Sequence, residues 1–140
     1  MFKYFRAFFT MLRAHKGQKD KAGKPYFLHP LRVSRGCESK SGKIVGLLHD
    51  VVEDNDGYKI NDFTFLNDQE LSALELLTHD KDVDYFTYIE KIKTNPLAKE
   101  VKLSDLKDNS NLNRLAKIEK KDIERVEKYK KAQQILGSSN

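Results

Sequence analysis

Residues 44–54 read IVGLLHDVVED, a strongly apolar run that ends in a cluster of ionisable side chains. His49 and Asp50 follow the apolar residues directly, and Glu53 and Asp54 come after two valines. Burying such groups costs free energy unless hydrogen bonds or opposite charges compensate them. On a helix, His49 and Glu53 are four apart and share a face, with Asp50 and Asp54 beside them. A divalent cation would supply the compensation; a capped helix end exposed to solvent is the alternative.

A second His-Asp pair, His79-Asp80, has a different sequence context. It precedes KDVD, at positions 81–84, in a charged segment between two apolar patterns. Such a segment is typical of a loop exposed to solvent. The pair is therefore not expected to bind a metal.

One helix cannot complete a metal site, so further ligands must come from other segments. His29 lies in PYFLHP, beside aromatic and apolar residues. Asp105 lies between Leu103 and Leu106, and an aspartate within an apolar pattern needs a partner. Two histidines and two aspartates would form a mixed nitrogen and oxygen ligand set. Such a set is typical of a site for Mn²⁺, Fe or another borderline metal, and not of a structural zinc site with thiolate ligands.

The composition indicates a single domain over residues 1–140 that is rich in helix. Hydrophobic residues make up 39% of the chain and charged residues 34%, and the formal net charge is +5. Cys37 is the one cysteine, which excludes an internal disulfide and agrees with a cytoplasmic location. No stretch approaches the roughly 20 apolar residues of a membrane span. The positive charge favours an anionic partner, but the lysines near the C-terminus alternate with glutamates, which indicates an exposed helix face more than a nucleic-acid surface.

Hydrophobic spacing predicts an all-α fold, a compact helical bundle. The predicted helices cover about residues 2–14, 26–35, 41–54, 67–78, 85–92, 95–115 and 116–136. Phe2, Phe5, Phe9 and Leu12 recur at helical spacing, so they are expected to pack the first helix on the domain. Residues 58–63, YKINDF, are a weak candidate for a strand.

Three segments together resemble a known family: AHKGQKDKAGKPYFLHPLRV at 14–33, GLLHDVVED at 46–54, and NPLAKEVKLSDLKDNSNLNRL at 95–115. Their order and spacing resemble the HD superfamily of metal-dependent phosphohydrolases. The resemblance is closer to the alarmone hydrolase domain of the RelA/SpoT family and its stand-alone small members. It covers about residues 5–115.

The resemblance implies roles for particular side chains. By position, the metal ligands would be His29, His49, Asp50 and Asp105. Glu53 and Asp54 would activate or orient the attacking water, and Lys21, Tyr26 and Asn109 would contact substrate. His15 matches a position for which a role at the helix end and a substrate contact are both open. At the position where the long alarmone enzymes carry a guanine-stacking arginine, this chain has Asp20.

The implied function is metal-dependent hydrolysis of a nucleotide phosphate ester, namely the 3′-pyrophosphate of (p)ppGpp, with Mn²⁺ as cofactor. One alternative is an HD-type nucleotidase or phosphatase that acts on another nucleotide. A second is a non-catalytic module that binds a nucleotide through its metal. A nucleic-acid binder is the alternative with least support, because no segment looks like a base-reading element. The sequence does not decide the oligomeric state.

Overall fold

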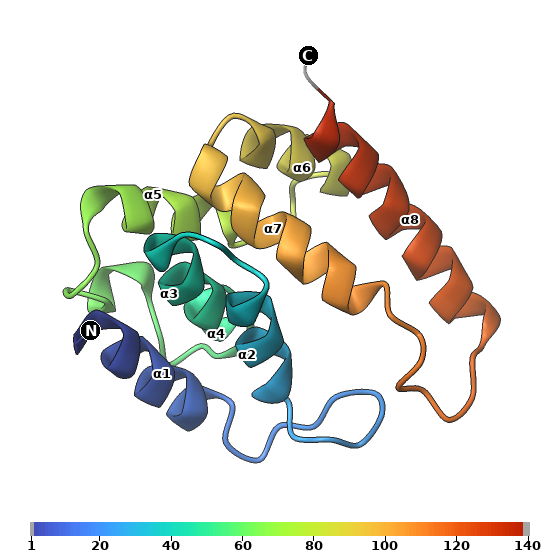
Figure 1. Ribbon diagram of the computed structural model, residues 1–140, viewed down its shortest axis with the longest axis horizontal. Coiled ribbons are helices and arrows are strands. Elements are labelled where there is room, and N and C mark those ends of the chain that lie inside the picture. The colour runs from blue at the N-terminus through green and yellow to red at the C-terminus, as the bar shows by residue number, and fades with distance from the viewer. Residues whose placement is uncertain (1, 139–140) are drawn as a thin grey trace.

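The computed structural model describes residues 2–138, which fold into α-helices joined by short loops (Figure 1). The elements are α1 (Phe2–Ala14), α2 (Leu28–Arg35), α3 (Lys40–Leu48), α4 (Val51–Asp54), η1 (Ile60–Asp62), α5 (Asp68–Leu77), α6 (Tyr85–Lys93), α7 (Pro96–Asn109) and α8 (Lys120–Gly137). Over this range there is no β-strand, and the all-α prediction is confirmed. The segment YKINDF contains the 3₁₀ turn η1, so the strand candidate was wrong.

Side-chain caps start several of these helices where the sequence indicates. The Asn67 side chain accepts a hydrogen bond from the N–H of Glu70, and the Glu70 carboxylate accepts one from the N–H of Asn67. This reciprocal capping box satisfies two donors that a helix start leaves free. Pro96 occupies the first turn of α7, where a missing N–H costs nothing, after Asn95 as cap.

Helix α7 is the centre of the bundle. It packs against α2, α3, α5, α6 and α8, and Figure 1 shows it crossing the middle of the molecule with α8 alongside. The core around it includes Leu47, Leu48, Ile89 and Leu106, all fully buried. This position of α7 brings Lys102 and Asp105 to the interior, next to α2 and α3. Within residues 2–138, no helix combines the length and apolarity needed to cross a bilayer.

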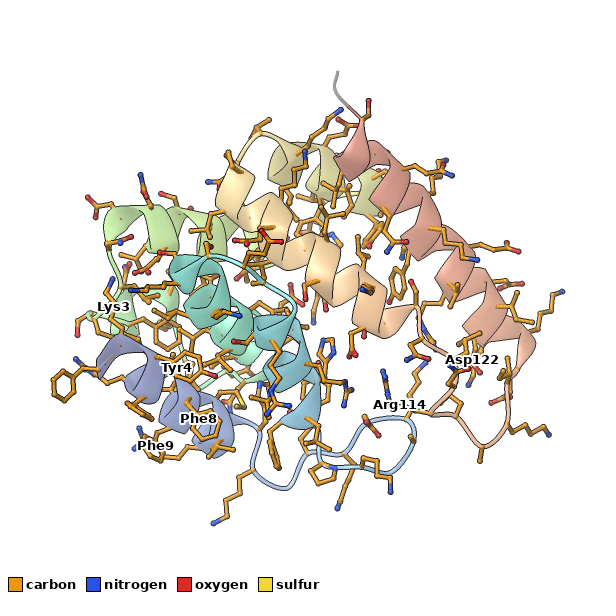
Figure 2. The ribbon with its side chains drawn as sticks, viewed as in Figure 1. Lys3, Tyr4, Phe8, Phe9, Arg114 and Asp122 are labelled. Atoms are coloured by element: carbon orange, nitrogen blue, oxygen red, sulfur yellow. The ribbon has the colours of Figure 1, made fainter. Side chains whose placement is uncertain are left out.

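The first helix packs through a different face from the predicted one. Ala7 and Met11 are fully buried, whereas Phe2, Phe5 and Phe9 are 87%, 50% and 57% exposed (Phe9 is labelled in Figure 2). The small side chain at position 7 lets α1 approach α3 closely, and the aromatic stripe is left outside. Helical spacing was right for α1, but the expectation that the phenylalanines form its packing face was wrong.

The predicted helix over residues 41–54 is broken into α3 and α4. His49 and Asp50 form the turn between them, with φ −103° and ψ −5° at Asp50. Helix α3 also lies very close to α2: a Cβ atom on Gly46 would sit 3.1 Å from the Cα of Ser34. The other differences concern where helices end and begin. Helix α7 stops at Asn109 instead of continuing to residue 115, and α8 begins at Lys120 instead of residue 116.

Candidate active site

Four predicted ligands meet where α2, the α3–α4 turn and α7 come together. His29, His49, Asp50 and Asp105 each offer one nitrogen or oxygen atom, and these atoms all lie within 4.8 Å of one another. His29 Nε2 is 2.9 Å from Asp105 Oδ1, and His49 Nε2 is 3.0 Å from Asp50 Oδ2. The fold therefore brings together side chains that the sequence places far apart.

Hydrogen bonds at the far side of both imidazole rings fix their orientation. His49 Nδ1 lies 2.6 Å from the carbonyl oxygen of Gly46, and His29 Nδ1 lies 2.7 Å from Oδ2 of Asp108. A ring that donates its Nδ1–H in this way can present an unprotonated Nε2 to a metal. Two such nitrogens and two carboxylate oxygens form a donor set that fits a divalent ion.

The buried charges of the cluster stabilise one another. Burial alone would raise the pKa of Asp105, but the Lys102 ammonium, 2.8 Å from Asp105 Oδ2, and His49 together lower it well below its usual range. Burial and the carboxylate of Asp50 raise the pKa of Tyr26 far above its ordinary value. The Tyr26 hydroxyl thus stays protonated and donates to Asp50 Oδ2 at 2.7 Å.

Asp108 and Lys102 support the cluster, and sequence reasoning did not assign these roles. Asp108 Oδ1 accepts from Arg32 Nε at 2.7 Å, while its other oxygen faces His29. The available signal was spacing: Lys102 and Asp108 lie three residues before and after Asp105 on one helix, and so share its side of α7. Asn109, four residues after Asp105, donates to Asp105 Oδ1 at 3.0 Å.

A cavity of about 370 Å³ opens beside His29. Its walls come from the loop after α1, from α2, from the end of α7 with the loop that follows, and from α8. All three predicted substrate residues, Lys21, Tyr26 and Asn109, line it, together with Arg114 and Arg125. Arginine and lysine side chains in such a pocket suit phosphate groups. Figure 2 shows Arg114 and Asp122 on the α7–α8 side of the molecule, where Lys21 Nζ lies 4.0 Å from Asp122 Oδ1.

Asp20 stabilises the loop after α1 that lines the cavity. Its Oδ1 accepts hydrogen bonds from the N–H groups of Ala22 and Lys24, both at 2.9 Å. Gly23, with φ of 79°, adopts the left-handed conformation that this turn needs. The carboxylate at this position therefore stabilises the loop's own turn.

Glu53 and Asp54 lie beside the cluster and not in the cavity wall that the described residues form. Glu53 accepts a hydrogen bond from the backbone N–H of His79, and Asp54 Oδ2 accepts one from Gln18 Nε2 at 3.3 Å. Burial raises the pKa of both carboxyl groups above the usual value, and the nearby Asp50 carboxylate adds to this. Both carboxylates are therefore more basic than ordinary ones.

Two other histidines lie near these carboxylates. His15 is 2% exposed, and its Nδ1 lies 2.9 Å from Oε1 of Gln18, the residue that contacts Asp54. His79 lies outside the group of four predicted metal ligands. The His79-Asp80 pair lies in the predicted loop between two helices, where Asp80 is exposed and the half-buried His79 ring stacks on Tyr88 with centroids 4.3 Å apart.

Comparison with known proteins gives several relatives, although no protein-family model matches the chain. Over 111 residues, or 76% of the chain, it is 32% identical to a protein of Mycoplasma genitalium named probable guanosine-3′,5′-bis(diphosphate) 3′-pyrophosphohydrolase. Over 56 residues, or 36% of the chain, it is 43% identical to the GTP pyrophosphokinase of Streptomyces coelicolor. The matched segments cover only 14% and 6% of these relatives, so the chain corresponds to a small part of each.

A solved structure matches almost the whole chain. It is described as a metazoan ortholog of SpoT that hydrolyses ppGpp and plays a role in starvation responses. The match covers 99% of this chain and 87% of the other, with a TM-score of 0.76 and 22% sequence identity. The chain thus has the all-helical fold of this SpoT ortholog, and its sequence is similar to segments of the probable guanosine-3′,5′-bis(diphosphate) 3′-pyrophosphohydrolase and of the GTP pyrophosphokinase.

Proposed function

We propose that this chain hydrolyses the 3′-pyrophosphate of (p)ppGpp, releasing pyrophosphate and leaving GDP or GTP. The observation that carries the proposal is the convergence of four ligand atoms, all within 4.8 Å of one another, beside a cavity with several cationic side chains. The names of the relatives agree with this substrate. A cytoplasmic location would suit such a nucleotide substrate.

The proposed cofactor is Mn²⁺, held by His29, His49, Asp50 and Asp105. An ion bound there would lower the pKa of a water molecule and polarise a phosphoryl oxygen. A mixed set of imidazole and carboxylate ligands is compatible with Mn²⁺.

The chain's own residues would orient the substrate and move the proton. Glu53 or Asp54 would accept the proton of the attacking water, a role for which a raised pKa is suited. Lys21 would offset phosphate charge at the pocket mouth, where its side chain is 58% exposed. Tyr26 and Asn109 line the same pocket and contact Asp50 and Asp105, so they would align the substrate with the metal ligands.

The test is hydrolysis of ppGpp by the purified protein with Mn²⁺, with GDP and pyrophosphate as readouts. Turnover should require the ion and should vanish in a His49→Ala/Asp50→Ala variant, while an exposed substitution, Asp56→Asn, should leave it unchanged. A protein that binds Mn²⁺ but does not hydrolyse ppGpp would contradict the proposed substrate. A panel of other nucleotides would then test the alternative of an HD-type phosphatase with another substrate.

A further inference from the structure

The turn between α5 and α6 reaches the candidate active site through one backbone group. The N–H of His79 donates a hydrogen bond to Oε1 of Glu53, which lies 26 residues earlier in the chain. This N–H is free for the contact because α5 ends at Leu77 and Thr78 leaves the helical conformation, with ψ of 107°. Glu53 is therefore held from outside its own short helix.

The side chain of His79 fixes the position of that N–H. Nε2 of the ring lies 2.8 Å from the carbonyl oxygen of Val83, across the turn. The ring also stacks on Tyr88, with an interplanar angle of 21°. Tyr88 is 6% exposed and donates its hydroxyl to the carbonyl of Leu77 at 2.6 Å. These contacts join residue 79 to the end of α5 and to α6.

The same aromatic layer continues to a predicted metal ligand. Nζ of Lys102 lies 5.2 Å from the centre of the Tyr88 ring and 2.8 Å from Oδ2 of Asp105. A series of direct contacts thus runs from Glu53 through His79, Tyr88 and Lys102 to Asp105. It connects a predicted water-activating carboxylate with the predicted metal ligands through packed and charged groups.

We propose that His79 is a positioning residue: its packed ring keeps its backbone N–H in place, and that N–H holds the Glu53 carboxylate in the orientation that proton transfer needs. The kinetic part of this inference rests on the function proposed above. A carboxylate free to rotate would spend less time correctly placed, and small misplacements of reacting groups reduce rates strongly.

The test is a double-mutant cycle of His79→Ala with Glu53→Gln, measured as kcat and KM for ppGpp with Mn²⁺. In the otherwise unchanged protein, His79→Ala should lower kcat by about tenfold, with KM and Mn²⁺ affinity nearly constant. In the Glu53→Gln background the same substitution should cause no further loss. Asp80→Asn, an exposed neighbour in the same turn, is the matched control and should retain full kcat.

Equal losses in both backgrounds would overturn the inference, as would an unchanged kcat or a parallel loss of Mn²⁺ binding. If His79→Ala fails to fold, His79→Gln takes its place in the cycle, since it removes the ring but keeps a hydrogen-bonding side chain.

If the unmodified protein does not hydrolyse ppGpp, the proposed function fails separately. Titration of the Glu53 carboxyl by NMR then decides: loss of the His79 ring should raise the pKa of Glu53, because its N–H donor would be displaced. An unchanged pKa would overturn the inference.

Discussion

Nδ1 of His29 and Oδ2 of Asp108 lie 2.7 Å apart, although 79 residues separate them in the chain. Arg32 and Arg114 hold the other oxygen of the same carboxylate, at 2.7 and 3.5 Å. Asp108 is thereby fixed on one side and orients the His29 ring on the other. We therefore expect Asp108 to influence metal affinity, although it contributes no atom to the group of predicted ligands.

Replacement of Asp108 by alanine should weaken Mn²⁺ binding by about 10- to 100-fold, because the His29 ring loses the acceptor that sets its orientation and tautomer. Isothermal titration calorimetry of the metal-free protein would measure the change directly. Asp62→Asn, at the exposed turn η1, is the control and should bind Mn²⁺ normally. Undiminished affinity in Asp108→Ala would show that the His29 ring keeps its orientation without Asp108.

Replacement of Lys102 by methionine should destabilise the metal-free protein by about 3–5 kcal/mol, since it removes the ammonium paired with the buried Asp105 carboxylate. Saturating Mn²⁺ should reduce this cost, because the ion supplies positive charge to the same carboxylate. Urea unfolding with and without Mn²⁺ measures both values. An equal cost under both conditions would argue that Lys102 and the ion do not share Asp105.

The buried and exposed faces of α1 should respond very differently to truncation. Met11→Ala should cost about 2–4 kcal/mol, because it opens a cavity in the core. Phe5→Ala, on the half-exposed stripe, should change stability by less than about 0.5 kcal/mol. Urea unfolding measures the free energy of unfolding of both variants. A larger loss for Phe5→Ala would mean that the phenylalanine stripe is the packing face, as the sequence suggested.

Glu70 should make stability depend on pH in the acidic range. Burial alone would raise the pKa of Glu70, but Lys3, the N–H of Asn67 and the hydroxyl of Ser41 outweigh it and lower the pKa below 4.5. As pH falls, the unfolded chain takes up the proton before the folded one does. The stabilisation is therefore complete above the unfolded pKa and is lost as pH falls through the folded value.

The measurement for Glu70 is the stability difference between the unmodified protein and Glu70→Gln as a function of pH. It should be largest near neutral pH and should shrink below about pH 4.5, the ordinary glutamate range. Glu75→Gln, an exposed substitution on the same helix, should show little difference at any pH. A difference that grows on acidification would mean that the folded pKa is raised.

The sequence predicted those parts of the fold and of the site that depend on local order or on resemblance. Asn67 and Pro96 mark helix starts through chemistry within one turn, and the structure places both as expected. The predicted ligands His29 and Asp105 followed from the motif order, and the fold brings His29 Nε2 and Asp105 Oδ1 to 2.9 Å from each other. Local spacing can also locate a helix without showing which of its faces is buried, as α1 demonstrates.

The features that were missed depend on contacts between distant segments. The break after Leu48 is absent from the hydrophobic pattern, which runs on through Val51 and Val52. The role of Asp108 requires His29 to lie beside it, and periodicity carries no information about that partner. The contact between His79 and Glu53 joins the turn after α5 to α4, and only tertiary packing determines their approach.

A metal ion bound by the four predicted ligands would also tie the abundance of the folded protein to metal supply. Because His29 and Asp105 are 76 residues apart, the complete ligand set exists only in the folded chain. An ion that binds the native state alone adds about 1.4 kcal/mol of stability for every tenfold rise in its concentration above Kd. A cell short of the ion would then hold less of the protein as well as less of its activity, since chains without the ion unfold more often and meet proteases more often.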